Sequence, residues 1–159
     1  MAPVTLSTRT LLVEDAGEVL TLQRAAYVPE ARRYRDPELP PLTQTLDEVR
    51  AELARPDVVG LGVRDDGRLV AAVRLRVDGT VAHLGRLVVA PDRQGEGIGT
   101  DLLAACERVL PPEVGEIRLF TGSRSEPTIR LYERVGYVRQ YETPAGTHDL
   151  VHLTKRLWE

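Results

Sequence analysis

The stretch VVAPDRQGEGIG, Val88 to Gly99, carries three glycines within its last five residues. An apolar run precedes it, and the helical pattern TDLLAACERVL follows it. Glycine costs about 0.5–1 kcal/mol relative to alanine in regular structure, so glycines at a strand-to-helix junction indicate that a ligand approaches the backbone closely. Because a helix N-terminus leaves N–H groups unpaired and carries the positive end of the helix dipole, the pattern predicts a phosphate site.

Two common phosphate-binding motifs do not match this loop. A P-loop requires Gly-Lys-Ser/Thr, and no such triplet follows the glycines. The dinucleotide motif G-x-G-x-x-G, begun at Gly95, would need its third glycine at Thr100. The preceding strand-like runs are also joined by hairpin signals and do not form a parallel βαβ unit. Taken alone, the loop leaves a glycine-rich turn without a ligand as the alternative.

The composition is that of a globular chain. With 159 residues, 42% apolar and 28% charged, we expect a single domain over residues 1–159. A net charge of −3 and scattered arginines argue against a nucleic-acid partner. One cysteine, Cys106, makes no internal disulfide, which fits a reducing, cytoplasmic setting. No long apolar run or export signal is seen, so we expect no membrane partner.

Strand and helix signals alternate along the chain. Thr45 and Glu48 form a capping box, and Asp66-Gly67 and Asp78-Gly79 are two-residue hairpin signals. The segment 28–44 is rich in proline and charge and predicts a long loop. The expected order is β-α-α-β-β-β-α-β-α-β-β: a strand at 4–13, helices at 14–27 and 45–53, three strands within 58–91, a helix to about 110, a strand at 116–122, a helix at 126–136, and strands at 137–142 and 148–158.

Two motifs in this order resemble those of the GCN5-related N-acetyltransferases (GNAT family), which move an acetyl group from acetyl-CoA to an amine. Residues 94–99, QGEGIG, match the signature Q/R-x-x-G-x-G/A, and residues 131–137, LYERVGY, match L-Y-x-x-x-G-F/Y. The resemblance implies an α/β GNAT fold. In this fold a mixed, mostly antiparallel central sheet of six to seven strands is flanked by about four helices.

The same resemblance implies where acetyl-CoA binds. The pyrophosphate would lie on backbone N–H groups of residues 94–100, and the pantetheine arm would pair with the backbone of Leu87 and Val89. Ser125 stands where the family often has Asn, and its hydroxyl can still bond to the pantetheine or to a helix end. The expected acetyl-CoA residues are Leu87, Val88, Val89, Gln94, Gly95, Glu96, Gly97, Ile98, Gly99, Thr100 and Ser125.

Acetyl transfer needs a neutral amine, a donor to the oxyanion and a proton for the leaving thiolate. By resemblance, Tyr132 supplies that proton or orients the CoA sulfur, and the Val89 N–H donates to the oxyanion. The alternative for Tyr132 is a place in the core. His83 stands where several family members have a glutamate base, and a neutral imidazole can accept the proton. A strand histidine without a role is the alternative, with the proton leaving through water or a carboxylate such as Glu52.

The acceptor is expected to be a primary amine, and a small molecule is favoured over a protein. A metabolite, a polyamine, an antibiotic and a protein N-terminus all stay open. By resemblance, segments 27–45 and 143–149 wall the acceptor site. The basic run Arg32–Arg35 could bind a carboxylate or phosphate, but acidic residues at 30, 36 and 38 nearly balance it, which favours a solvated loop.

Three histidines far apart in sequence show no metal-ligand spacing, so no metal is expected. A homodimer stays open. Two readings from other classes remain: a non-catalytic CoA-binding sensor or partner-binding module on the same fold, and an interaction protein without a small ligand. A CoA-binding sensor would need no proton donor at Tyr132. An interaction protein without a small ligand would make both motif matches coincidental.

Overall fold

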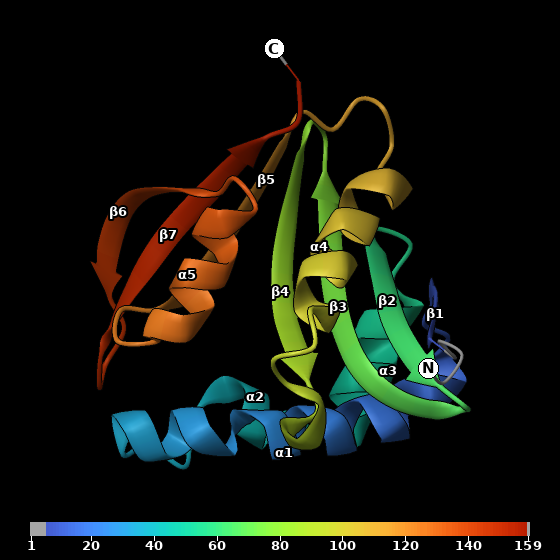
Figure 1. Ribbon diagram of the computed structural model, residues 1–159, viewed down its shortest axis with the longest axis horizontal. Coiled ribbons are helices and arrows are strands. Elements are labelled where there is room, and N and C mark those ends of the chain that lie inside the picture. Colours follow the sequence, from blue (N-terminus) through green and yellow to red (C-terminus); the bar gives the residue numbers. More distant parts are fainter. Residues whose placement is uncertain (1–5, 159) are drawn as a thin grey trace.

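The computed structural model describes residues 6–158, which form a seven-stranded sheet with the order β1-β2-β3-β4-β5-β7-β6 (Figure 1). Neighbouring strands are antiparallel except β4 and β5, which are parallel. The strands are β1 (Leu6–Thr10), β2 (Val58–Asp65), β3 (Arg68–Asp78), β4 (Val81–Val89), β5 (Glu116–Gly122), β6 (Val138–Pro144) and β7 (Asp149–Arg156). The helices are α1 (Ala16–Tyr34), α2 (Pro40–Thr43), α3 (Leu46–Ala54), α4 (Ile98–Val109) and α5 (Glu126–Arg134), with 3₁₀ turns at Val13–Asp15 and Pro91–Arg93.

The predicted α/β class and the mostly antiparallel sheet are confirmed. The described residues contain one helix more than the predicted order, the four-residue α2. The first strand ends at Thr10 and not at residue 13, because the chain turns there into the 3₁₀ turn. Residues 4 and 5 of that predicted strand lie outside the described residues.

Local turn chemistry places the hairpins. Asp66 and Gly67 both have positive φ, 50° and 86°, as a two-residue type I′ turn requires. The second hairpin lies one residue later than predicted. Asp78 pairs with Val81, so Gly79, at φ 63°, and Thr80 make the turn. Glycine at the first turn position fixes this register, because it adopts positive φ without a Cβ clash.

The predicted loop at 28–44 is wrong in its first half, because α1 continues through Pro29 to Tyr34. Proline lacks an N–H but has a helical φ, so it removes one helical hydrogen bond without reversing the chain. Tertiary contacts of Tyr34, only 5% exposed, hold the last turns in place. Arg35 then ends the helix in the left-handed conformation, with φ 52°. The loop that remains before α2 is short.

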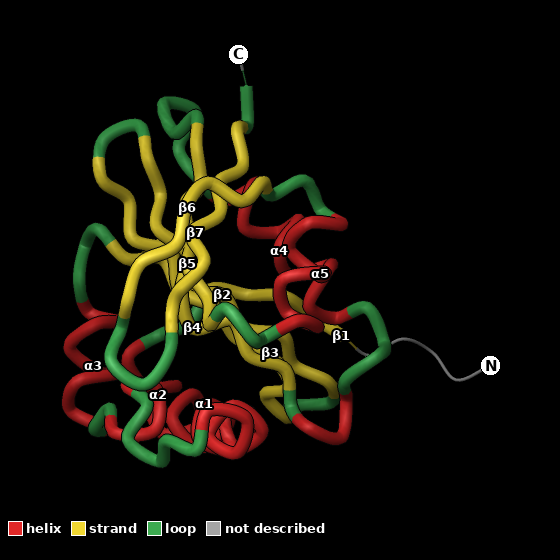
Figure 2. The backbone as a smooth tube through the Cα atoms, turned by 90° about the vertical axis from the view of Figure 1, so that its left-hand side faces the viewer, coloured by secondary structure: helices red, strands yellow, loops and turns green. Residues whose placement is uncertain are grey.

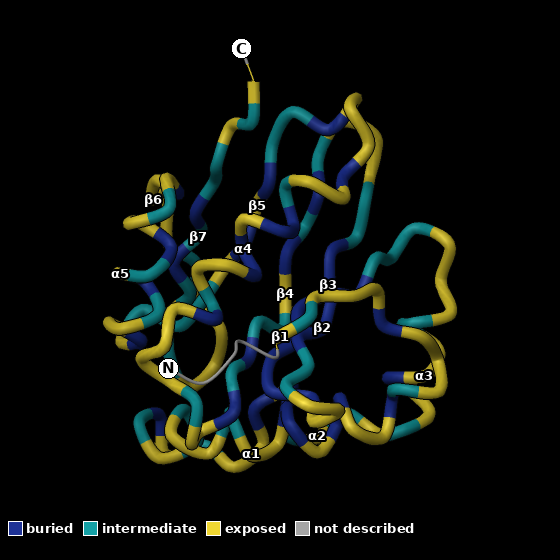
Figure 3. Tube along the Cα trace, turned by 45° about the vertical axis from the view of Figure 1, so that its right-hand side comes forward, coloured by how far each residue is buried: buried dark blue, intermediate teal, exposed yellow. Residues whose placement is uncertain are grey.

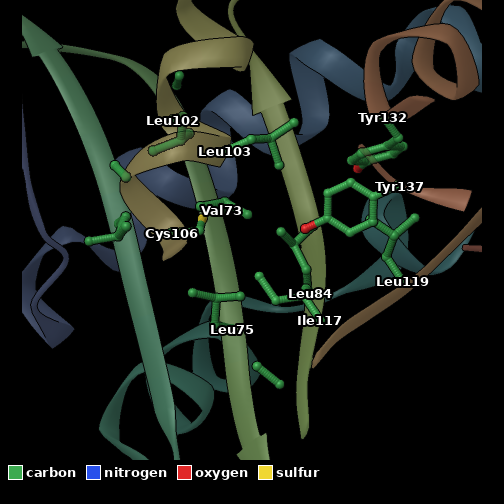
Figure 4. Close-up of a cluster of buried hydrophobic side chains, with 14 of the residues drawn as sticks. Val73, Leu75, Leu84, Leu102, Leu103, Cys106, Ile117, Leu119, Tyr132 and Tyr137 are labelled. Atoms are coloured by element: carbon green, nitrogen blue, oxygen red, sulfur yellow. The ribbon is translucent and has the colours of Figure 1, made fainter. Parts of the chain in front are cut away.

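Two hydrophobic cores lie on opposite faces of the sheet. Helices α4 and α5 cover one face, and α1 to α3 lie on the other side (Figure 2). Figure 3 shows the buried positions along the central strands and the inner faces of the helices. The larger core joins β3, β4 and β5 to α4, with Val73, Leu84 and Leu102 among its members (Figure 4). The smaller one joins Val19 of α1 and Val49 of α3 to the strands.

A β-bulge interrupts the pairing of β3 with β4 near the middle of the sheet. Ala72 pairs with Val88 but Arg74 pairs with Gly85, so Arg86 and Leu87 together oppose one residue of β3. Arg86 takes the left-handed conformation, with φ 55°. Pairing of β4 with β5 covers only Val81–His83, and beyond it the two strands diverge (Figure 1).

Candidate active site

A cavity of about 1230 Å³ occupies the opening between β4 and β5 and reaches both helical layers. One part is lined by the glycine loop, the start of α4 and residues of α5 such as Leu131. The other part is lined by α1, α3 and strand residues such as Arg74. The volume exceeds the roughly 300–1,000 Å³ usual for one small ligand. The cavity therefore has room for a cosubstrate and an acceptor.

The glycine loop leaves helix N–H groups free at one end of this cavity. Gly97 is the N-cap of α4 and supplies no side-chain oxygen to the first N–H groups. Gly95 and Gly97 have φ of 81° and 83°, and a Cβ at either would meet no atom within 4 Å. Gly99 differs, since its Cβ would lie 3.4 Å from Leu131 Cδ2. Two glycines thus set the backbone beside open space, and the third lets α5 approach α4.

The charged side chains of this loop are already paired. Arg93 lies 2.7 Å from an oxygen of Asp65 and 3.0 Å from one of Glu96. Hydrogen bonds to these carboxylates, Glu96 foremost, raise the pKa of the Arg93 guanidinium. Arg93 lines the cavity but Glu96 does not. An anion at this loop would therefore depend chiefly on backbone N–H groups, with Arg134 of α5 as an additional cation on the wall.

Tyr132, the predicted proton donor, lies on α5. It is 5% exposed, lines the cavity and packs edge-to-face on Tyr137 at 5.5 Å between ring centres (Figure 4). No hydrogen bond joins its hydroxyl to another described residue. Burial, followed by the nearby Tyr27, raises the pKa of Tyr132 well above its ordinary value. The hydroxyl is therefore protonated at neutral pH and able to donate to a ligand.

His83 lines the acceptor part of the cavity on β4. Its strand partners are Arg76 on β3 and Arg118 on β5. Burial lowers the pKa of His83, and these two arginines lower it further. The imidazole is thus neutral at pH 7, the form that accepts a proton.

A buried polar network forms the floor of the acceptor part. Arg74, 3% exposed, donates to Glu52 at 2.6 Å and to the side-chain oxygens of Gln23 and Gln44 at 3.0 Å. Burial lowers the pKa of Arg74, and Glu52 opposes that shift. Gln44 also donates to Glu52 at 3.0 Å. The Glu52 carboxylate thus accepts hydrogen bonds from both Arg74 and Gln44.

Ser125 ties α5 to α1. Its hydroxyl donates to Glu30 at 2.5 Å and lies 2.6 Å from the Tyr34 hydroxyl, which also accepts from the Arg124 N–H. Tyr34 stacks on His148 at 4.1 Å between ring centres. Ser125 does not line the cavity. Its hydroxyl is engaged in this tie, and its contact with CoA stays a prediction.

The structure brings most of the predicted residues together. Those that line the cavity are Tyr132, His83, Leu87, Val88, Val89, Gln94, Gly95, Gly97, Ile98, Gly99 and Thr100, whereas Glu96 and Ser125 do not. Sequence reasoning missed Arg74 and Arg86, which also line it, and included Tyr27 only as the first residue of the segment 27–45. The signal for Arg74 was an arginine inside the apolar run VAAVRLRV. The basic run Arg32–Arg35 is helical except for its last residue, and only Arg33 and Tyr34 of it line the cavity.

Within residues 6–158, no cluster of three or more His, Cys, Asp or Glu side chains could hold a metal ion. None of the described helices is long and apolar enough to cross a membrane.

Comparison with known proteins agrees with this geometry. The family model for the Acetyltransferase (GNAT) family matches residues 19–137. The chain belongs to this family. The match covers both motifs, QGEGIG and LYERVGY.

Solved GNAT structures share the fold along nearly the whole chain. An acetyltransferase of the GNAT family from Streptococcus pneumoniae gives a TM-score of 0.79 at 16% identity, over 96% of this chain and 99% of that one. The PaiA N-acetyltransferase from Thermoplasma acidophilum, determined with coenzyme A, gives 0.78 at 20% identity, over 98% and 99%.

Two curated GNAT relatives are more similar in sequence. S-(2-succino)cysteine N-acetyltransferase from Bacillus subtilis (strain 168) is 33% identical over 60% of this chain and 64% of its own length. Mycothiol acetyltransferase from Clavibacter michiganensis is 29% identical over 85% of this chain and 43% of its own length. The chain thus spans less than two thirds of the curated relatives it matches.

Proposed function

We propose that the protein transfers the acetyl group of acetyl-CoA to the primary amine of a small molecule, by direct attack in a ternary complex. The observation that carries this proposal is one cavity lined both by the uncapped start of α4 and by the polar residues of α1, α3 and β3, with Tyr132 in its wall. GNAT family membership supports the same conclusion.

The residues present fit acetyl-CoA as cosubstrate. Gly95 and Gly97 present an uncapped helix start to open space, which suits a diphosphate. The backbone beyond the bulge, at Leu87 and Val89, is unpaired with β5 and can pair with an extended amide-containing arm. When bound, acetyl-CoA supplies the activated acetyl group.

Two groups of the chain act on the reacting atoms in this proposal. The Val89 N–H donates to the carbonyl oxygen as negative charge develops on it. Tyr132 donates its proton to the leaving sulfur, a role supported by its protonated hydroxyl, which has no hydrogen-bond partner among the described residues.

His83 is our candidate for the base that takes the amine proton, directly or through water. The wall's carboxylates are otherwise engaged: Glu52 with Arg74, Glu30 with Arg33, and Glu48 in the capping box with Thr45. Each of them already accepts a hydrogen bond from another group of the protein. His83 has no such engagement with a described residue and is neutral at pH 7 because burial lowers its pKa.

A small acceptor suits the enclosed chamber better than a protein chain. The name of the Bacillus relative gives its acceptor as S-(2-succino)cysteine, a small molecule, which supports this choice. The test is calorimetric titration with acetyl-CoA, followed by a thiol-release assay with a panel of amines. We expect binding and amine-dependent release of free CoA. Binding without release by any amine would favour the CoA-binding sensor, and no binding would end the proposal.

A further inference from the structure

Arg86 is a charged side chain without a protein partner inside the acceptor part of the cavity. Its Nε is fully enclosed and has no hydrogen-bond partner. No ion pair joins its guanidinium to another described residue. The residue as a whole is only partly buried, so the rest of its guanidinium can meet a ligand in the cavity, and the enclosed Nε is a donor that an anion there would satisfy.

The backbone of Arg86 is also unusual. It adopts φ 55° at the bulge, a conformation in which glycine carries no penalty and other residues do. A glycine would meet the needs of the bulge alone. The side chain of Arg86, and not its backbone, must therefore explain why an arginine occupies this position.

The bulge turns Arg86 toward the chamber formed by α1, α3 and β3. Electrostatic effects of Arg86 reach both Tyr27 of α1 and Arg74 of β3. These residues line the same part of the cavity. The positively charged group thus stands in the wall that faces an acceptor.

None of the glutamates in the chamber wall forms an ion pair with Arg86. It carries five arginines against three glutamates, namely Arg33, Arg55, Arg74, Arg76 and Arg86 against Glu30, Glu48 and Glu52. Glu30 and Glu52 are paired with Arg33 and Arg74. Glu48 is held in the capping box of α3. Arg55 is paired with Asp57, whereas Arg76 forms no close ion pair with a described residue. Arg76 and Arg86 therefore stand against the single unpaired carboxylate of Glu48.

We propose that the acceptor is an amino acid, or a similar small amine with a carboxylate near its amino group, and that Arg86 binds this carboxylate. The inference rests on the function proposed above. A guanidinium fork matches a carboxylate with two parallel hydrogen bonds. Arg86 directly precedes Leu87 and lies three residues from Val89, where strand residues rise about 3.3 Å each. The backbones of Arg86 and Val89 are thus about 10 Å apart, a distance that the arginine side chain and a small amino acid can span together.

The test compares L-amino acids with their own amides in the thiol-release assay. We use alanine, methionine, phenylalanine and S-methylcysteine, each as acid and amide, together with spermidine and a tetrapeptide. For the wild type, kcat/KM should be about ten- to a hundredfold higher for acids than for amides, the range of a charge-assisted hydrogen bond. The difference should appear mainly in KM.

Arg86→Gln should remove this discrimination while acetyl-CoA affinity stays unchanged. Arg86→Lys, which keeps the charge without the fork, should retain part of it. Arg86→Gly suits the left-handed backbone and guards against loss of folding. The matched control is Arg50→Gln, an exposed arginine of α3 outside the cavity, which should behave as the wild type.

A second readout is independent of turnover. With CoA present, acids but not amides should raise the melting temperature of the wild type, and Arg86→Gly should lose this increase. Turnover of acids and amides at equal rates, in wild type and variants alike, would refute the carboxylate site and leave the acetyltransferase standing. Binding of acetyl-CoA without turnover of any amine would instead refute the proposed function, and this inference with it.

Discussion

Gly97→Ala tests two possible reasons for a glycine at the start of α4: its left-handed backbone and the space that it leaves for a ligand. Gly97 has φ 83°, and a Cβ there meets no atom within 4 Å. A left-handed backbone costs a residue with a Cβ about 1–2 kcal/mol. For a chain of this size that loss lowers the melting temperature by about 2–8 °C. The added methyl group also stands in the space where we place the diphosphate.

Gly67→Ala is the matched control. Gly67 has φ 86° and equally open surroundings, but it lies in the β2–β3 turn and does not line the cavity. Both variants should therefore lose a similar free energy of unfolding. Only Gly97→Ala should weaken acetyl-CoA binding, by about ten- to a hundredfold if one charge-assisted hydrogen bond is lost.

The measurements are thermal unfolding without ligand and calorimetric titration with acetyl-CoA. If both variants lose the same free energy of unfolding and Gly97→Ala still binds acetyl-CoA as the wild type does, the diphosphate does not lie on this loop. A loss of affinity in both variants would show that the effect is general destabilisation.

Two further predictions concern the reacting groups. Tyr132→Phe should keep acetyl-CoA affinity and lower kcat by about ten- to a thousandfold, because a general acid is lost while no hydrogen bond to a described residue is broken; unchanged kcat with a reactive amine would return Tyr132 to the core. His83→Gln should remove the acidic limb of the kcat/KM profile. Since burial and then Arg76 and Arg118 lower the pKa of His83, the wild-type limb should lie below pH 6.5, with activity falling as pH drops through that pKa. An acidic limb at the same pH in His83→Gln would show that a group other than His83 titrates.

The parts of the fold that sequence predicts are those fixed by local chemistry. The capping box is present as expected, with Thr45 and Glu48 bonded reciprocally at 2.9 and 3.2 Å. Asp66-Gly67 marks its hairpin because few residue pairs accept positive φ twice. Gly97 precedes α4 as predicted. Each of these depends on residues within four positions of one another.

The parts that sequence missed depend on distant contacts. Residues 28–34 read as a loop because Pro29 and clustered charges disfavour a helix, yet contacts of Tyr34 with the β5–α5 segment hold them helical. Arg86 gave no local sign of a left-handed bulge, since most arginines avoid that conformation. The acceptor chamber is lined by residues of α1, α3, β3 and β4. No residue spacing within one segment predicts that these four elements come together.

The tie between α1 and α5 has a consequence for the order in which the molecule assembles. Its hydrogen bonds join Ser125 to Tyr34 and Glu30, residues 91 and 95 positions away along the chain. Contacts of such long range form slowly, because a long loop must close before they stabilise anything. The hairpins β2–β3 and β3–β4 need no such closure. The chamber wall should therefore form after these hairpins, so that weakening the tie speeds unfolding more than it slows folding.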